Sequence, residues 1–404
     1  MAEILETDIV VIGGGIAGLW LNYRLRQAGF STVLLERNTL GGGQSVRSQG
    51  IIHGGTKYAL QGALTNAANA ISDMPARWRA CLKGEGDVDL RHAKVLSEHH
   101  YMWSRDRLMS KLTSFFASKA VRGKVENDDP AQRPAAFQSP QFHGNFYALN
   151  EIVLDVPTVI QALIDPFADG IYQYDCAQHS CLELDSQSDH DSVAAVQIFG
   201  KSKRLRIKAQ RYVLTAGEGN ESVLHSADLH GPAMQRRPLH MVVVKHHYPH
   251  PVYAHCIGSG TKPLLTITTH YMADGQPVWY LGGNLAETGV EFDKATQIDA
   301  AKAMVKELLP WVDLGQAEWN SFMIHRAEPQ QSAMLRPDSA FVHSKGNLVT
   351  CWPTKLALTP NLVDDVMATF SRDKIQPKHG LDYSQLQFLP RPPVSIPVWQ
   401  ELLG

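Results

Sequence analysis

Gly13, Gly15 and Gly18 have the spacing with which a polypeptide backbone binds a pyrophosphate, in the pattern G-x-G-x-x-G. The first glycine of such a pattern permits a tight turn, the second lets backbone N–H groups approach the phosphates, and the third allows a helix to pack closely on a strand. Glu36 stands farther along the chain, where a carboxylate can accept both hydrogen bonds of an adenosine ribose. These four residues predict a dinucleotide site.

A strand–helix–strand unit is expected to position these residues. Residues 8–12 form an apolar run rich in β-branched side chains, which predicts a buried parallel strand. Residues 19–29 predict a helix that stops at a glycine, and residues 32–36 predict a second buried strand that ends in Glu36. A glycine turn without a ligand is the alternative, but it would need neither the second strand nor the terminal acid.

A second glycine-dense segment, residues 41–58, follows this unit, although a simple NAD domain would not need one. Residues 50–58 read Gly-Ile-Ile-His-Gly-Gly-Thr-Lys-Tyr. Through this segment the chain resembles the FAD-dependent oxidoreductases of the D-amino-acid oxidase superfamily, and in particular its glycerol-3-phosphate dehydrogenase and 2-hydroxyglutarate dehydrogenase branch. The resemblance implies that the segment passes along the flavin ring.

Three later segments agree with the resemblance. Residues 211–220 predict a strand that closes on small residues, like the family's strand beneath the pyrophosphate, and residues 151–163 are also similar to the family. Residues 346–360 resemble the family's last flavin loop, and a helix is expected from about 361 to 370. This loop departs from the family pattern, because Trp352-Pro353-Thr354 stands where two glycines are common.

The fingerprint and the resemblance together imply non-covalently bound FAD. The residues expected to contact the cofactor are Gly13, Gly15, Ile16, Ala17, Gly18, Glu36, Arg37, Ser45, Val46, Arg47, Ser48, Ala216, Gly217, Lys355 and Leu356. The sequence has no second G-x-G-x-x-G after a strand, which argues against reductases that also bind NAD(P)H. The expected electron acceptor is therefore oxygen, a quinone or another protein.

The expected fold class is α/β, or α+β overall, with a Rossmann-like FAD-binding domain and a discontinuous substrate domain built on a mixed or antiparallel sheet. The FAD-binding domain is assigned residues 1–58, 151–228 and 346–380, the substrate domain residues 59–150 and 229–345, and a C-terminal tail residues 381–404. Antiparallel strands of the substrate domain are expected at residues 239–248, 263–271 and 277–283.

His53, Arg326 and Lys355 are the candidates for catalysis. Oxidation of a hydroxyl-bearing carbon requires a base for the hydroxyl proton, and a histidine titrates near neutral pH. The resemblance implies that His53 lies near the flavin ring, with flavin tuning or simple packing as alternatives. It also implies that Arg326 binds a substrate carboxylate or phosphate, and that Lys355 lies near flavin N1 or a substrate phosphate. A structural ion pair and a solvated lysine are the respective alternatives.

Three further residues are expected to contact the substrate. Arg336 competes with Arg326 for the role of anion anchor, because a guanidinium makes two charge-assisted hydrogen bonds with either a carboxylate or a phosphate. Tyr271 and Tyr280 are aromatic residues of the predicted strands that would wall the site, with core packing as the alternative.

These residues favour an FAD-dependent dehydrogenase or oxidase that oxidises a small anionic 2-hydroxy acid or polyol phosphate by hydride transfer to flavin N5. An amino-acid or secondary-amine oxidase is the alternative, since an amine substrate needs only to arrive deprotonated. A flavoprotein subunit or a non-catalytic flavin-binding module is a further alternative, suggested by the departure at residues 352–354.

The composition indicates which partners the protein can attract and which cellular compartment suits it. The chain carries 38 Lys+Arg against 40 Asp+Glu, which gives no overall field to attract nucleic acid. Its five cysteines form no CxxC pair, which argues against a zinc ribbon and favours a reducing compartment. No signal peptide or spanning helix is predicted, so a cytoplasmic location is expected. The basic residues 201–208 leave open a peripheral contact with the inner face of a membrane.

Two remaining features carry weaker signals. Histidines between residues 240 and 255 invite a metal site, but His246 and His247 would point to opposite faces of a strand, so no metal is predicted. The proline-punctuated residues 389–399 are expected to pack along the surface or to contact a partner.

Overall fold

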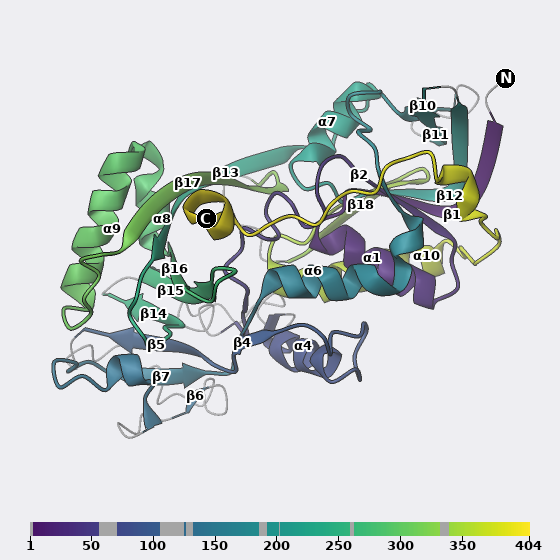
Figure 1. The fold of residues 1–404 in the computed structure, drawn as a ribbon. Coiled ribbons are helices and arrows are strands. Elements are labelled where there is room, and N and C mark those ends of the chain that lie inside the picture. Colours follow the sequence, from purple (N-terminus) through teal and green to yellow (C-terminus); the bar gives the residue numbers. More distant parts are fainter. Residues whose placement is uncertain are drawn as a thin grey trace.

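The computed structural model of the 404-residue chain describes residues 3–55, 71–105, 125–126, 132–185, 192–201, 203–258, 262–331 and 339–404. Two large sheets form the two ends of an elongated molecule, and a small third sheet lies between them (Figure 1). The first sheet contains strands from the beginning, the middle and the last quarter of the chain, so the chain leaves it and returns. The expected mixed α/β class is confirmed.

The first sheet has eight strands, with β10-β11-β12-β1-β2-β9 along its main path and β19 and β18 joined beside β12. Its strands are β1 (Glu3–Ile12), β2 (Thr32–Glu36), β9 (Ile171–Gln173), β10 (Leu182–Leu184), β11 (Val193–Phe199), β12 (Arg204–Leu214), β18 (Phe341–Lys345) and β19 (Leu348–Trp352). β1 pairs in parallel with β2 and β12, and β12 pairs in parallel with β19. The turns that follow β1, β12 and β19 therefore meet at one edge of the sheet.

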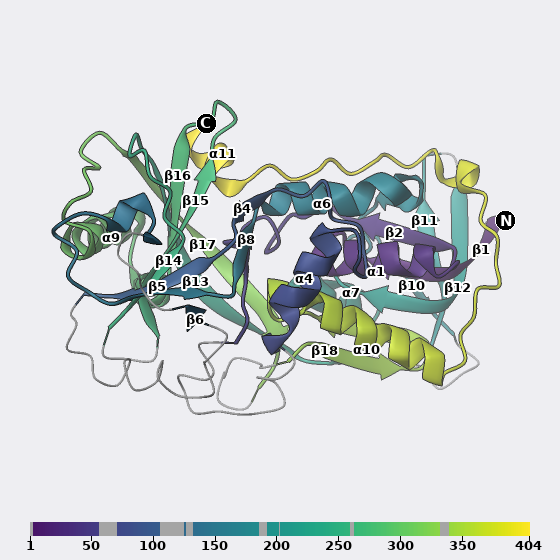
Figure 2. The same ribbon diagram turned by 90° about the horizontal axis from the view of Figure 1, so that it is seen from below.

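Helices α1 (Ile16–Gln27), α6 (Val156–Ile164) and α10 (Thr359–Arg372) lie side by side against one face of this sheet (Figure 2). α7 (Gly219–Ser226) follows β12. β2, β19 and the second half of β1 are buried on both faces, as parallel strands usually are. On one face, the apolar residues of these strands share a core with the three helices. The two helices predicted from the sequence near the glycine turn and after the last flavin loop are α1 and α10.

α4 (Met74–Leu82) lies in the segment that the sequence assigned to the substrate domain, yet it packs on the helices of the first sheet. The ring centroids of Trp78 and Trp20 are 4.8 Å apart, and both side chains are fully buried. The indole Nε1–H of Trp78 donates a hydrogen bond to the carbonyl oxygen of Ala357 at 3.1 Å. The first excursion of the chain therefore contributes to the nucleotide-binding core before it reaches the second sheet.

The second sheet also has eight strands, in the order β17-β13-β16-β15-β14-β5-β7-β6. Its strands are β5 (His100–Ser104), β6 (Val125–Glu126), β7 (Phe146–Leu149), β13 (Met234–Lys245), β14 (Ala254–Ile257), β15 (Pro263–Tyr271), β16 (Pro277–Gly282) and β17 (Glu318–Pro329). The predicted hairpin is confirmed, since β15 and β16 pair antiparallel. Helices α8 (Asn284–Thr288) and α9 (Lys294–Leu308) pack on this sheet.

A three-stranded sheet lies between the two large sheets. Its central strand β8 (Ile152–Leu154) pairs antiparallel with β3 (Ile51–Ile52) on one side and with β4 (Val95–Ser97) on the other. Ile52 stands opposite Ile152, so the residue that follows β3 lies beside the residue that precedes β8. This pairing brings together residues 53 and 151.

The C-terminal tail runs along the molecule from the first large sheet to the second (Figure 2). Val394 bridges to Leu40, and α11 (Val398–Leu403) packs against the second sheet. There Trp399 stacks on His270, with the ring centroids 4.2 Å apart. The expected packing along the surface is confirmed, and the tail contacts both large sheets.

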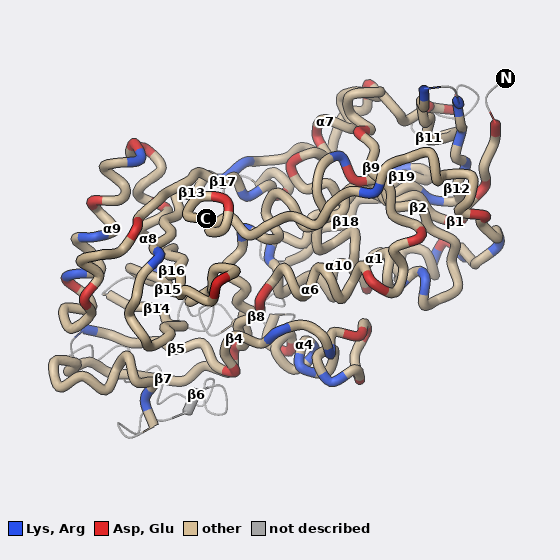
Figure 3. Tube along the Cα trace, viewed as in Figure 1, with Lys and Arg blue, Asp and Glu red and all other residues tan. Residues whose placement is uncertain are grey.

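Acidic and basic residues are interspersed along the described chain at both ends of the molecule (Figure 3), in agreement with the formal net charge of −2. On β12, exposed Arg204 and Lys208 alternate with buried Leu205 and Ile207, so the basic stretch is one face of a strand. Within the described ranges, no helix combines the length and the apolar composition that crossing a bilayer requires.

The burial of His270 predicts that the folded protein loses stability in mild acid. Burial lowers the pKa of His270 from its ordinary value of 6.5 to about 3 in the folded protein. Because the unfolded chain binds a proton that the folded chain does not, the contribution of His270 to stability is complete above pH 6.5 and is lost as the pH falls toward 3. Through this residue, we expect the free energy of unfolding in urea to fall by about 2 kcal/mol between about pH 7 and pH 5.

The His270→Phe variant keeps a ring against Trp399 but removes the titrating group. Its unfolding free energy should change by about 2 kcal/mol less than that of the wild type over the same pH range, whatever its absolute stability. His343→Phe, at an exposed position, is the matched control and should keep the wild-type pH dependence. Equal pH dependence of the wild type and His270→Phe would contradict the prediction.

Candidate active site

A cavity of about 1220 Å³ has walls from both large sheets. Its walls come from the turns after β1, β2 and β12, from the glycine-dense segment before β3, from strands β13 and β17, and from the loop after β19. Ligands of open α/β sheets bind outside the carboxyl ends of the strands, which is where three of these turns lie. The cavity therefore joins the predicted dinucleotide site to the predicted substrate domain.

The turn from β1 into α1 builds one end of the cavity. Gly15 is the N-cap residue of α1 and has no side chain that could accept a hydrogen bond from the first helical turn. Gly15, Ile16 and Ala17 line the cavity, so the helix N-terminus faces it. Backbone N–H groups and the helix dipole favour an anion at such a position.

Glu36 and Arg37 lie on the cavity wall after β2. One oxygen of the Glu36 carboxylate accepts a hydrogen bond from the N–H of Gly14 at 2.7 Å, and the other accepts from the N–H of Asn38 at 2.8 Å. Two backbone donors thus fix this carboxylate beside the glycine turn. Its position at the end of the second strand suits the ribose contact expected of it.

Gly13 and Gly18 lie behind the wall and shape the turn. A Cβ on Gly18 would lie 1.9 Å from the carbonyl oxygen of Gly13. Gly13 has a φ of +111°, which side chains rarely adopt, and a Cβ there would lie 2.5 Å from the backbone of Ala216. The hydroxyl of Thr215 donates a hydrogen bond to the Gly13 carbonyl at 2.9 Å. The turn is therefore packed too tightly against the end of β12 for other residues.

Ser45, Arg47 and Ser48 of the glycine-dense segment lie on the middle of the wall. The Ser45 hydroxyl accepts a hydrogen bond from the N–H of Ile16 at 3.0 Å, which ties the segment to α1. Val46 differs from the expectation, because its side chain is only 2% exposed and packs into the core beneath the wall. It supports the cavity wall from behind.

The turn after β12 and the loop after β19 contribute the predicted residues Ala216, Gly217, Lys355 and Leu356 to the wall. The indole of Trp352 donates a hydrogen bond to the carbonyl oxygen of Gly217 at 2.9 Å. Thr354 has a φ of +61°, a conformation that favours glycine. The loop therefore keeps a glycine-like backbone at Thr354, while Trp352 holds the two loops together.

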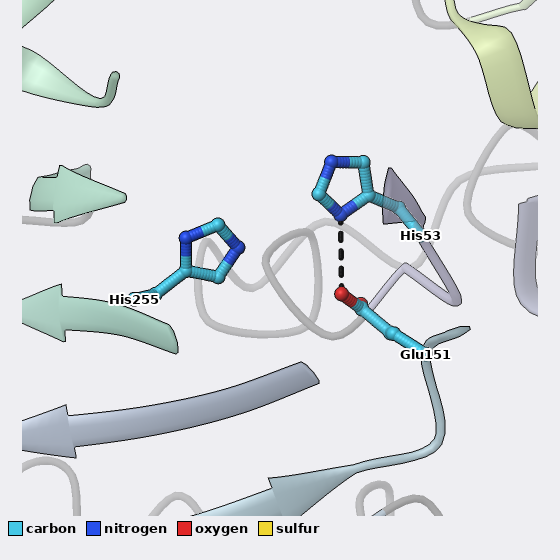
Figure 4. A group of neighbouring side chains, drawn as sticks. All are labelled: His53, Glu151 and His255. Atoms are coloured by element: carbon cyan, nitrogen blue, oxygen red, sulfur yellow. Dashed lines mark hydrogen bonds and ion pairs between the residues drawn. The ribbon is translucent and has the colours of Figure 1, made fainter. Parts of the chain in front are cut away.

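His53 and Glu151 form a hydrogen-bonded pair at the edge of the same cavity (Figure 4). Their Nδ1 and Oε2 atoms are 3.1 Å apart. Glu151 is 1% exposed, and its other oxygen accepts a hydrogen bond from the N–H of Gly54 at 3.1 Å. A buried carboxylate that binds one imidazole nitrogen orients the ring and stabilises the positive charge that the ring acquires with a proton.

His255 lies beside this pair and also lines the cavity. Its ring is nearly parallel to that of His53, with the centroids 5.9 Å apart, and its Nδ1 lies 2.7 Å from the hydroxyl oxygen of Thr266. The ring of His100 follows, with its centroid 4.2 Å from that of His255. Three histidines and one carboxylate therefore meet where the second sheet approaches β3 and β8.

Basic side chains gather where the second large sheet borders the cavity. Arg326 Nη2 lies 3.8 Å from the Oε1 atom of Glu287. Lys262 Nζ lies 2.5 Å from the Oε2 atom of the same carboxylate. Burial alone would raise the pKa of Glu287, but Lys262 and the neighbouring arginines outweigh burial and lower this pKa below its usual value of 4.5. Arg237 makes two hydrogen bonds, of 2.7 and 3.1 Å, with buried Glu328. At Glu287, two cations therefore share one carboxylate.

Two predicted substrate contacts lie away from this cavity. Tyr280 is fully buried within the second sheet, and its hydroxyl donates a hydrogen bond to the carbonyl oxygen of Arg47 at 2.6 Å. It packs in the core and supports the cavity wall from behind. Tyr271 is 38% exposed at the far end of β15, where Lys94 lies over its ring. Arg336, the rival anion anchor, lies outside the described residues.

Four residues of the site have little or no signal in the sequence: Glu151, Arg237, His255 and Lys262. Glu151 begins the family-like residues 151–163, but no local pattern pairs it with His53. His255 belongs to the histidine-rich stretch, whose other members have separate surroundings. His240, for example, bonds to Gly289 and Ser321.

A model of the family described as DAO, FAD dependent oxidoreductase, matches residues 8–346 of the chain. The chain belongs to this family. FAD is therefore the cofactor of this DAO-family enzyme, and the predicted superfamily resemblance is confirmed.

The DAO-family enzyme is similar over 401 residues to a probable FAD-dependent oxidoreductase of Pseudomonas aeruginosa, at 51% identity and with 99% of both chains covered. The crystal structure of an FAD-dependent oxidoreductase from the same organism has a TM-score of 0.83 and 46% identity, again over 99% of both chains. A stretch of 61 residues is 48% identical to mitochondrial glycerol-3-phosphate dehydrogenase of Rattus norvegicus. This stretch makes up 15% of this chain and 8% of the rat protein.

Two more distant structures share the fold of the DAO-family enzyme. Glycine oxidase from Geobacillus kaustophilus has a TM-score of 0.63 at 15% identity, over 94% of this chain and 98% of that one. FAD-bound L-α-glycerophosphate oxidase from Mycoplasma pneumoniae has a TM-score of 0.63 at 12% identity, over 94% of this chain and 98% of that one. The fold is common to both proteins, so the fold alone leaves the substrate of this enzyme open.

The chemistry of the cavity wall suits FAD. The N-terminus of α1 offers N–H groups to a pyrophosphate, and the fixed carboxylate of Glu36 offers acceptors to a ribose. Ser45, Arg47 and His53 line the same cavity, so one cavity borders both the nucleotide end and the candidate base.

The tight packing at Gly18 predicts that Gly18→Ala loses FAD. The added methyl group would overlap the Gly13 carbonyl, so α1 would have to move away from the turn that faces the pyrophosphate. We expect the purified variant to carry about tenfold less FAD per chain, because overpacking costs about 1–3 kcal/mol. The ratio of flavin absorbance to protein absorbance measures the FAD content per chain. Gly380→Ala, where a Cβ meets no atom within 4 Å, is the control, and an equal FAD content of the two variants would contradict the prediction.

Proposed function

We propose that this FAD-dependent oxidoreductase oxidises the hydroxyl-bearing carbon of a small anion, either a 2-hydroxy acid or a polyol phosphate. The observation that carries the proposal is the hydrogen bond between His53, which lines the cavity, and the buried carboxylate of Glu151. Oxidation of an alcohol to a carbonyl removes a hydride from carbon and a proton from oxygen. Bound FAD supplies the hydride acceptor.

His53 accepts the hydroxyl proton in this proposal. With its proton on Nδ1, the imidazole donates to Glu151 and keeps an acceptor lone pair on Nε2. When Nε2 takes the substrate proton, the ring becomes positively charged, and the adjacent carboxylate stabilises that charge. An amine that arrives deprotonated needs no such base, so the pair favours oxidation of a C–O bond over oxidation of a C–N bond.

Arg326, Lys262 and Lys355 bind the anionic part of the substrate. Arg326 and Lys262 both form ion pairs with the carboxylate of Glu287, so two cationic groups lie together on this part of the wall. Lys355 lines the cavity from the loop after β19 and is only 8% exposed. Charge-assisted bonds to a carboxylate or phosphate orient the substrate, and the electrons pass on to oxygen, a quinone or a protein. The short identity to glycerol-3-phosphate dehydrogenase supports this substrate class.

Removal of the base tests the proposal directly. We expect His53→Gln and Glu151→Gln to slow anaerobic reduction of the flavin by a 2-hydroxy acid or polyol phosphate by about 10²–10⁴-fold, the usual contribution of a general base. Stopped-flow bleaching of the bound flavin measures the rate across a panel of hydroxy acids, polyol phosphates and amines. His343→Gln, at an exposed position, is the matched control and should reduce at the wild-type rate. Turnover of amines alone would overturn the proposal.

Arg326→Gln tests the anion site. Loss of charge-assisted hydrogen bonds worth about 1.5–3 kcal/mol should raise the KM for the anionic substrate by about 10- to 100-fold, with a smaller change in kcat. A neutral polyol of the same length, which has no charge for Arg326 to bind, is the control and should show little change in KM. An unchanged KM for the anion would contradict the assignment of Arg326 to substrate binding.

A further inference from the structure

His53, Glu151 and His255 are the one group of three or more potential metal ligands that lies together among the residues whose placement is described. One ligand atom from each residue lies within 4.8 Å of the other two. The residues come from three places in the chain: the end of β3, the start of β8 and strand β14. Figure 4 shows the two rings and the carboxylate facing one another.

Hydrogen bonds to residues outside the group hold two of its three side chains, His255 and Glu151. The Nδ1 of His255 lies 2.7 Å from the hydroxyl oxygen of Thr266. With its proton on Nδ1, His255 donates to this hydroxyl and keeps a lone pair on Nε2 for an ion. One oxygen of Glu151 is held by the N–H of Gly54, and the other faces His53 Nδ1. Outer hydrogen bonds of this kind fix the tautomer and orientation of metal ligands in proteins.

Two imidazoles and one carboxylate form a ligand set that suits Zn²⁺ and related divalent transition metals. Three protein ligands leave the fourth position of a tetrahedral ion open, and His53 and His255 both line the cavity. The buried charge of Glu151 adds electrostatic attraction for a cation, while its 1% exposure limits competition from water.

We propose that His53, Glu151 and His255 bind one divalent transition-metal ion, with Zn²⁺ as the best match, and that the bound ion inhibits the enzyme reversibly. The ion takes the position of the proton between His53 Nδ1 and Glu151. A neutral imidazole that coordinates through Nδ1 carries its single proton on Nε2, so His53 then has no lone pair with which to accept the substrate proton. The inhibition rests on the proposed function, whereas the binding of the ion does not.

The binding is tested on the FAD-loaded protein with Zn²⁺ and Co²⁺ alone, after treatment with a chelator. We expect isothermal titration to give one Zn²⁺ per chain, and Co²⁺ to give the absorption bands of a tetrahedral site at wavelengths beyond the flavin absorption. His255→Ala should weaken Zn²⁺ binding by about a hundredfold, and Thr266→Val, which removes only the orienting hydroxyl, by roughly tenfold. His343→Ala is the matched control and should bind as the wild type does.

Inhibition is measured as the ratio of flavin-reduction rates with and without Zn²⁺. This ratio should approach one in His255→Ala at concentrations that inhibit the wild type, and a chelator should restore the wild-type rate. Absence of Zn²⁺ and Co²⁺ binding to the wild type, or wild-type affinity in both His255→Ala and Thr266→Val, would overturn the metal site. If the ion binds as expected but no hydroxy acid or polyol phosphate reduces the flavin, the proposed substrate fails and the metal site stands.

Discussion

An ionised carboxylate that leaves water must find hydrogen-bond donors inside the protein, and Glu151 meets this requirement in a way that organises the whole site. Its side chain bonds to His53 and to the backbone of Gly54, both next to β3. Its own carbonyl oxygen accepts a hydrogen bond from the N–H of His100, the first residue of β5 in the second sheet. One buried residue thus links the small middle sheet to the second large sheet and bonds to the ring of the candidate base.

The parts of the structure that depend on neighbouring residues are predictable from the sequence. The glycine turn, α1 and β2 follow from patterns within a few tens of residues, and the β15–β16 hairpin follows from two strands around a short turn. Glu151 is different, because 98 residues separate it from His53 and only the pairing of β3 with β8 brings them together. No pattern of residues near His53 or Glu151 in the sequence indicates that these two strands pair.

Strand register decides whether Tyr280 lines the cavity or packs in the core, the two possibilities that the sequence left open. Which face of a strand a side chain occupies depends on alignment with the neighbouring strand, and here Tyr280 stands opposite Thr268 inside the sheet. The loop after β19 is a different case, because its Trp352 and Thr354 stand in a segment where the resemblance leads one to expect small residues. Here the Trp352 indole bonds to the Gly217 carbonyl, and Thr354 adopts a positive φ.

The tail's contacts with the glycine-dense segment have a consequence for biosynthesis. Ser395 lies on the cavity wall, its N–H donates to the carbonyl of Leu40, and Glu401 pairs with Arg47 at 3.4 Å. At translation rates of about 5–20 residues per second, Glu401 leaves the ribosome roughly 20–70 s after Arg47. The contacts of the tail with the glycine-dense segment can therefore form only after almost the whole chain has been synthesised.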